Sequence, residues 1–135
     1  MIEPSARHLV RLRAKGRCEY CLLLEDHSEL KHHVEHVIAK QHGGTDDLAN
    51  LALPCHRCNL RKGPNLSGID PLTDKVVRLF NPRQDAWDDH FKLEGLTIEG
   101  ITPTGRATVQ VMAMNDARRV ELRQALLTQG KSPMR

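Results

Sequence analysis

Four cysteines occur as two Cys-x2-Cys pairs, namely Cys18 and Cys21, then Cys55 and Cys58. This pattern is typical of a closed tetrahedral zinc site in which all four thiolates are ligands. Two disulfides are the alternative, but residues 1–5 lack the basic start and apolar run of a secretory signal. We therefore expect a structural zinc ion. The 33 residues between the pairs exceed the zinc-ribbon spacing of about 15–20 residues. A zinc ribbon with a purely structural role is therefore the weaker interpretation.

The segment between and just after the pairs carries side chains that could hydrolyse a phosphodiester: Glu35, His36, Asn50 and Asn59. Such hydrolysis needs a divalent ion to neutralise charge on the phosphoryl and leaving oxygens, and a base to take a proton from water. His36 is the natural base because imidazole titrates nearest neutrality. Adjacent side chains face opposite ways in a regular strand, so Glu35 and His36 can share a site only at a twisted strand end.

These residues resemble the HNH endonuclease family, whose core is a ββα-metal unit. The matching pattern covers residues 18–63 and combines the cysteine pairs with Glu35-His36, Gly43-Gly44, Asn50-Leu51, Asn59 and a basic helix end. Residues 79–83, 87–91 and 105–109 resemble a C-terminal extension found on some of these nucleases. The sequence departs from the family at Ala39, where proline is frequent, and at Glu35, where aspartate is common.

The resemblance implies a role for each of these polar residues. Glu35 and the side-chain oxygen of Asn59 are the expected protein ligands of the catalytic ion. Hard oxygen ligands suit Mg²⁺ or Mn²⁺, with Ni²⁺ or another divalent ion as alternatives. Asn50 is expected to hydrogen-bond the loop backbone and so orient His36; an ordinary turn asparagine is the alternative. Cleavage would leave 5′-phosphate and 3′-hydroxyl ends.

Four further residues are candidates for substrate binding: His33, Arg57, Arg61 and Lys62. His33 lies on the same strand face as Glu35, so it could touch the phosphate or the metal; a structural histidine is the alternative. The three basic residues lie on the expected helix beside the metal and could grip the DNA backbone. A solvated basic face is the alternative for them.

The elements that must position these residues can be predicted for the first half of the chain. Ser5 could cap a helix over residues 6–15, with Leu9, Val10 and Leu12 on its buried side and its basic residues exposed. We expect strands within residues 29–38 and 51–53 around a glycine turn, then a helix over residues 56–62. The order of elements predicts a zinc-clamped ββα core over residues 1–63.

The second half, residues 64–135, is expected to form a small α+β extension packed on the core. Residues 64–74 have the composition of a connector. Strands are expected at 75–80, 96–101 and 107–114, and a helical turn at 85–91. Asn115 or Asp116 could cap a last helix ending near Thr128, with Val120, Leu126 and Leu127 toward the core. The expected fold class is therefore α+β.

Composition limits the class of partner and the compartment. The net charge of +3 is compatible with a polyanion but does not demonstrate one. Aromatic residues are only 3 % of the chain, too few for the base-stacking surfaces of proteins that bind single strands. We therefore expect the protein to bind the phosphates of a nucleic acid rather than to stack on its bases. No apolar run approaches the roughly 20 residues of a membrane span. We expect no membrane association and a cytoplasmic location.

The sequence thus predicts a zinc-stabilised, divalent-metal-dependent HNH endonuclease that nicks or cleaves DNA, as a monomer or a homodimer. A non-catalytic zinc-knuckle DNA-binding or adaptor protein on the same scaffold is the main alternative, although such a module needs neither His36 nor Asn59. A thiol redox switch is a third interpretation. It would need a thioredoxin-like βαβ pattern, which the order of expected elements does not show.

Overall fold

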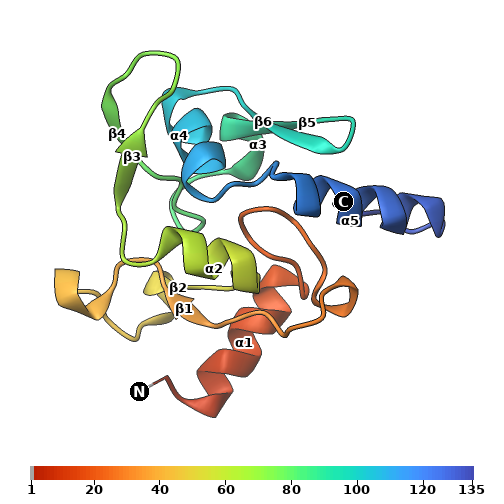
Figure 1. The fold of residues 1–135 in the computed structure, drawn as a ribbon. Helices are drawn as coiled ribbons and strands as arrows, with labels where there is room; N and C mark the ends of the chain where they lie inside the picture. The colour runs from red at the N-terminus through yellow and green to blue at the C-terminus, as the bar shows by residue number, and fades with distance from the viewer. Residues whose placement is uncertain (1) are drawn as a thin grey trace.

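The computed structural model describes residues 2–135 and has an α+β fold with short antiparallel strands, as predicted (Figure 1). Its elements run in the order α1 (Pro4–Ala14), β1 (Glu35–His36), β2 (Leu51–Ala52), α2 (His56–Lys62), β3 (Ser67–Ile69), β4 (Val76–Arg78), α3 (Trp87–His90), β5 (Phe91–Glu94), β6 (Thr97–Gly100), α4 (Pro103–Val111) and α5 (Ala117–Thr128). Single 3₁₀ turns lie at Glu25–His27, Lys40–His42 and Leu48–Asn50. None of the helices within residues 2–135 has the length and apolar character needed to cross a membrane.

The predicted ββα unit is formed by β1, β2 and α2. The two strands pair antiparallel, with Glu35 opposite Ala52 and His36 opposite Leu51. The Cys55 sulfur caps α2 by accepting a hydrogen bond from the Cys58 amide. The second cysteine pair therefore forms the first turn of the helix. Glycine follows α2 at position 63 with a positive φ, as expected for a helix end.

Strand β1 is much shorter than the strand expected within residues 29–38. Just before β1, side chains bind the backbone groups that would otherwise pair with a neighbouring strand. The His32 amide donates to the Glu25 carboxylate at 2.8 Å, and the His32 carbonyl accepts from Arg11 at 2.8 Å. With both of its backbone groups bound in this way, His32 has none left for a strand partner. Regular pairing is therefore confined to two residues, and both lie at a strand end.

Helix α1 begins at Pro4 rather than residue 6, because proline is pre-organised for the first helical position. Ser5 is thus inside the helix, and Glu3 occupies the cap position. The predicted burial of Leu9 and Leu12 is wrong: they are 49 % and 60 % exposed. Only a narrow seam of α1 faces the ββα unit, and Val10 fills it together with Val34, Leu51 and Leu53.

The basic residues of α1 were expected on the exposed side of the helix, but two of them bind backbone carbonyls of neighbouring segments. Arg11 binds the His32 carbonyl, and Arg13 donates to the carbonyls of Leu48 and Leu51 at 2.9 and 2.6 Å. These guanidinium groups therefore hold α1 against the loops that lead into β1 and β2.

The second half contains a helix where a strand was expected. Residues 107–114 fall largely in α4, which starts at Pro103 and is capped by the Thr102 hydroxyl accepting from the Gly105 amide. The proline and the cap nucleate a helix, and they override the β-like composition that follows. The expected connector 64–74 also contains β3, which pairs with β4.

Of the two expected caps, Asn115 and Asp116, it is Asp116 that precedes helix α5, and its side chain accepts from the Arg119 amide. Leu126 is buried as predicted, but Val120 is only half-buried and Leu127 is 52 % exposed. Arg119 and Arg123 are buried in their place. The face of α5 toward the rest of the molecule is therefore cationic as well as apolar.

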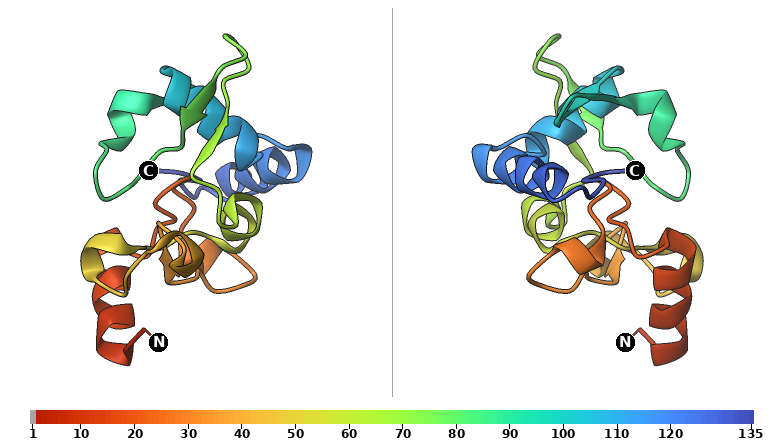
Figure 2. Two further views of the ribbon diagram at one scale, coloured as in Figure 1. Left: turned by 90° about the vertical axis from the view of Figure 1, so that its left-hand side faces the viewer. Right: turned by 90° about the vertical axis from the view of Figure 1, so that its right-hand side faces the viewer.

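One hydrophobic cluster joins the two halves of the chain. Tyr20 and Phe91 both meet the Phe80 ring edge-on, and the Trp87 indole donates to the Tyr20 carbonyl at 2.8 Å. The cluster also contains all four cysteines. In the two side views the ββα unit lies between α1 and the second half, with α5 beside α2 (Figure 2). The division into domains at residues 63 and 64 stays a prediction.

Candidate active site and metal centre

The four cysteines converge on one point at the start of α2. Their sulfur atoms all lie within 4.8 Å of one another, and every cysteine is buried and free. The Cys21 and Cys55 sulfurs are 3.7 Å apart, close to the edge of about 3.8 Å of a tetrahedron with Zn–S bonds of about 2.3 Å. The cluster therefore fits a structural zinc ion, and the two-disulfide alternative is wrong.

A buried arginine from the second half completes this centre. One nitrogen of Arg119 lies 2.9 Å from the Cys58 sulfur and 3.6 Å from the Cys55 sulfur, and the other donates to the Met112 carbonyl at 2.6 Å. Burial by itself would lower the pKa of Arg119, but the neighbouring thiolates raise it above its ordinary value. A permanent positive charge thus faces a cluster that is negative when it holds zinc. Sequence spacing gave no signal for this contact.

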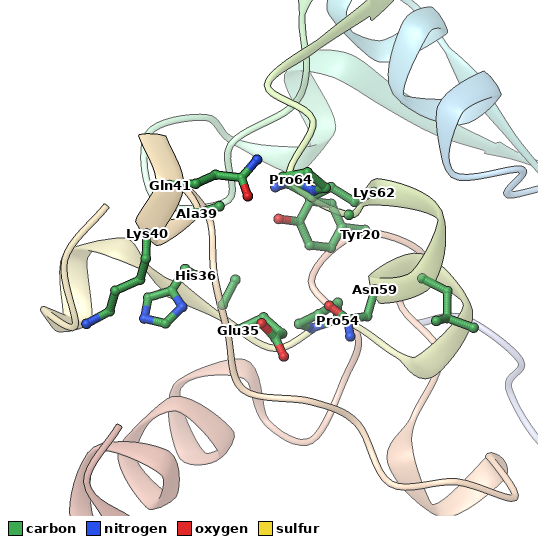
Figure 3. Close-up of a pocket in the computed structure, with 13 residues that line it drawn as sticks. Tyr20, Glu35, His36, Ala39, Lys40, Gln41, Pro54, Asn59, Lys62 and Pro64 are labelled. Atoms are coloured by element: carbon green, nitrogen blue, oxygen red, sulfur yellow. The ribbon is translucent and has the colours of Figure 1, made fainter. Parts of the chain in front are cut away.

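Strand β1 and helix α2 together line a pocket of about 500 Å³ (Figure 3). Glu35, His36 and Asn59 all line it, as do Tyr20 and Gln41, which sequence reasoning did not select. Although Glu35 and His36 are adjacent in sequence, both reach the pocket because β1 is only two residues long. The structure therefore brings three of the four expected catalytic residues to one cavity.

His36 is held by a carboxylate from the loop between β1 and β2. The His36 Nε2 atom lies 2.7 Å from an Asp46 oxygen, which is also 3.0 Å from the Lys40 ammonium. Hydrogen bonds from His36 and Lys40 hold the pKa of Asp46 well below its usual range. Because an ionised carboxylate can only accept, Nε2 carries a proton, and in the neutral imidazole the lone pair is then on Nδ1.

Asn50 does not line the pocket, but it closes the loop that carries Asp46. Its side-chain oxygen accepts from the Ile38 amide at 2.9 Å, and its nitrogen donates to the carbonyls of Ile38 and Thr45 at 3.0 and 2.8 Å. Gly44 packs so tightly here that a Cβ would collide with the Ile38 carbonyl. These contacts have the form that the expected positioning role requires, and the role itself stays a proposal.

The expected substrate-binding residues are distributed differently. Lys62 lines the pocket, but its buried ammonium donates to the Val37 carbonyl at 2.8 Å, and burial lowers its pKa. His33 does not line the pocket; its Nε2 atom lies 3.1 Å from Nδ1 of His56. Arg57 and Arg61 are exposed on α2, and within residues 2–135 their side chains have no hydrogen bond or ion pair.

Comparison with known proteins agrees with the motif in the first half of the chain. Residues 18–65 match the model of the family described as HNH endonuclease, which confirms the resemblance for that segment. Over 109 residues, or 79 % of the chain, the sequence is 28 % identical to the Septu protein PtuB of Bacillus thuringiensis. The match spans only 40 % of that relative's length. No solved structure matches the chain.

Proposed function

We propose that this chain, whose residues 18–65 match the HNH endonuclease family, is a divalent-metal-dependent endonuclease that hydrolyses DNA phosphodiester bonds. One observation carries the proposal. Glu35, His36 and Asn59 line a single pocket beside the four-cysteine cluster, and a carboxylate holds the imidazole of His36. A module that only binds DNA would not need an oriented imidazole beside two oxygen donors.

Glu35 and Asn59 would hold the catalytic ion. A carboxylate and an amide oxygen are hard ligands, and they leave coordination positions for water and the scissile phosphate, which suits Mg²⁺ or Mn²⁺. When bound, such an ion neutralises charge on the phosphoryl oxygens and on the leaving 3′ oxygen. The other cluster of metal-binding side chains within residues 2–135 is the four cysteines, whose soft sulfurs suit zinc.

His36 would act as the general base through Nδ1, because Nε2 donates its proton to Asp46. As the oxygen of a water molecule forms its bond to phosphorus, Nδ1 takes a proton from that water. The bond from phosphorus to the 3′ oxygen breaks, and the leaving oxygen takes a proton from solvent. Asp46 stabilises the imidazolium that forms, in the way a carboxylate supports a catalytic histidine elsewhere.

Conversion of supercoiled plasmid to nicked and linear forms tests this proposal. We expect the wild type to cut with Mg²⁺ or Mn²⁺ and to stop when EDTA is added. His36→Ala should lower the rate by about 10²–10⁴-fold, the usual contribution of a general base, while the zinc content stays unchanged. His8→Ala is the matched control, because His8 is exposed on α1 and does not line the pocket.

Two results would contradict the proposal. Full activity in His36→Ala would exclude His36 as the base. Tight duplex binding by the wild type with no cutting in Mg²⁺, Mn²⁺ or Ni²⁺ would favour the DNA-binding adaptor. Because one active site cuts one strand, clean double-strand breaks would require two successive nicks or a homodimer, and the homodimer stays a prediction.

A further inference from the structure

Three arginines stand apart from the rest of the chain. Of the 13 arginines in the sequence, ten use their side chains in hydrogen bonds or ion pairs within residues 2–135. The three without such a partner in this part of the chain are Arg57, Arg61 and Arg118. All three are exposed, and they lie on α2 and at the start of α5.

Two of these arginines line one pocket of about 400 Å³ between α2 and α5. Arg57 contributes from α2 and Arg118 from α5, and the pocket also contains His27. Nδ1 of His27 is buried and has no hydrogen-bond partner within residues 2–135. Glu29 is the one acidic residue among those that line the pocket. The pocket therefore offers two guanidinium forks that have no hydrogen-bond or ion-pair partner within residues 2–135, a donor set that suits phosphate.

This second pocket adjoins the proposed active site across α2. Leu60 lines both pockets and is 66 % exposed, while Asn59 faces only the first and Arg57 only the second. A DNA strand carries a charge about every 3.4 Å along the duplex axis. A strand that runs from Asn59 toward Leu60 would bring its next phosphates to the second pocket, which Arg57 and Arg118 line.

We infer that Arg118 of α5, together with Arg57 of α2, forms a second phosphate-binding site that holds the DNA backbone next to the cut. The inference rests on the proposed function for the identity of the substrate. It assigns the C-terminal helix a direct part in substrate binding. An acidic protein segment is the competing occupant, but it would not account for the position of this pocket, which shares Leu60 with the proposed active site.

Equilibrium binding of a short fluorescent duplex to the His36→Ala chain, without added Mg²⁺ or Mn²⁺, tests the inference independently of cleavage. Adding Arg118→Gln should weaken binding about tenfold at low salt. It should also reduce the slope of log affinity against log salt by about 0.9, the value for one lost phosphate contact. Lys131→Gln is the control, because it removes the same charge from an exposed residue just after α5 that lines neither pocket.

The outcomes separate the site from the nuclease activity. An Arg118→Gln chain with the wild-type salt slope, or an equal loss in Lys131→Gln, would overturn the site even if the wild type cuts plasmid. Loss of binding in Arg118→Gln alone would support the site even if no metal gave cutting. A parallel titration uses poly-L-glutamate: if Arg118→Gln weakens only that interaction, the pocket belongs to an acidic protein segment and the inference fails.

Discussion

At the scale of single residues, the candidate site depends on a hydrogen bond that spans ten positions. His36 was evident from the sequence because a histidine follows a carboxylate between two cysteine pairs. Its partner Asp46 was not, because an aspartate after two glycines looks like an ordinary turn residue. The turn is nevertheless what brings the Asp46 carboxylate to 2.7 Å from Nε2. Asp46 is therefore both a turn residue and the hydrogen-bond partner of His36.

Replacing Asp46 should therefore impair catalysis more than binding. In Asp46→Asn the amide can donate to Nε2, which would leave the proton on Nδ1 and remove the base. We expect kcat to fall about 10²–10⁴-fold in Mg²⁺, with KM and duplex affinity changed less than threefold. Steady-state cutting of a labelled duplex measures both constants, and Asp47→Asn in the same exposed loop is the control. Equal loss in the control would assign Asp46 to loop structure instead.

At the scale of elements, local signals succeeded where the backbone satisfies its own hydrogen bonds. The bounds of α2 and the Asp116 cap of α5 were predictable because caps and glycine stops act within a few residues. The strand expected at 107–114 was wrong because Pro103 and Thr102 start a helix upstream of it. The strand expected at 29–38 was shortened because side chains distant in sequence bind the His32 backbone.

An ion pair fixes how α4 meets the β3–β4 hairpin. Asp70, which is buried, accepts two hydrogen bonds of 2.9 Å from Arg106 of α4. The paired guanidinium and the nearby donors of Leu72 and Thr73 keep the pKa of Asp70 well below its usual range. A carboxylate of this kind stabilises the fold above its unfolded pKa of about 3.9 and loses that contribution as pH falls toward its folded pKa.

Asp70→Asn should therefore lower stability at neutral pH and not in acid. We expect the free energy of unfolding of the mutant to be clearly below that of the wild type at pH 7, and the gap to narrow below about pH 4. Urea titrations across this pH range measure it. Asp26→Asn, at an exposed side chain with no hydrogen bond or ion pair within residues 2–135, should leave the profile unchanged. A gap that stays constant with pH would show that the effect is steric rather than electrostatic.

At the scale of the whole molecule, the zinc centre is shared between the two halves of the chain. The ligands come from residues 18–58, whereas Arg119 reaches the Cys58 sulfur across 61 positions. The same hydrophobic cluster contains the cysteines and apolar residues of the second half, including Phe80, Phe91 and Met112. Removing zinc should consequently loosen both halves, since the binding free energy of a structural zinc is also folding free energy.

Arg119→Met tests the link between zinc and the second half. Loss of the guanidinium leaves the thiolates without a neutralising charge and the Met112 carbonyl without its donor. We expect zinc transfer to a colorimetric chelator to be about tenfold faster and Tm to fall, with Arg119→Lys intermediate. Arg118→Met should release zinc like the wild type because it is exposed and does not touch sulfur. An unchanged release rate in Arg119→Met would show that the contact has no effect on the metal.

The sequence by itself determined the chemistry that is available: four thiolates at zinc spacing, a histidine beside a carboxylate, two asparagines, and a short helix over residues 56–62 that starts within the second cysteine pair. These signals depend on residues close together in the sequence, so they can be identified without knowledge of the fold. Only the tertiary structure decided which side chains meet, including Asp46 with His36 and Arg119 with Cys58, and that Arg118 and Arg57 line the same pocket. Such contacts depend on how loops close and how helices pack, and no periodicity or spacing along the chain encodes them.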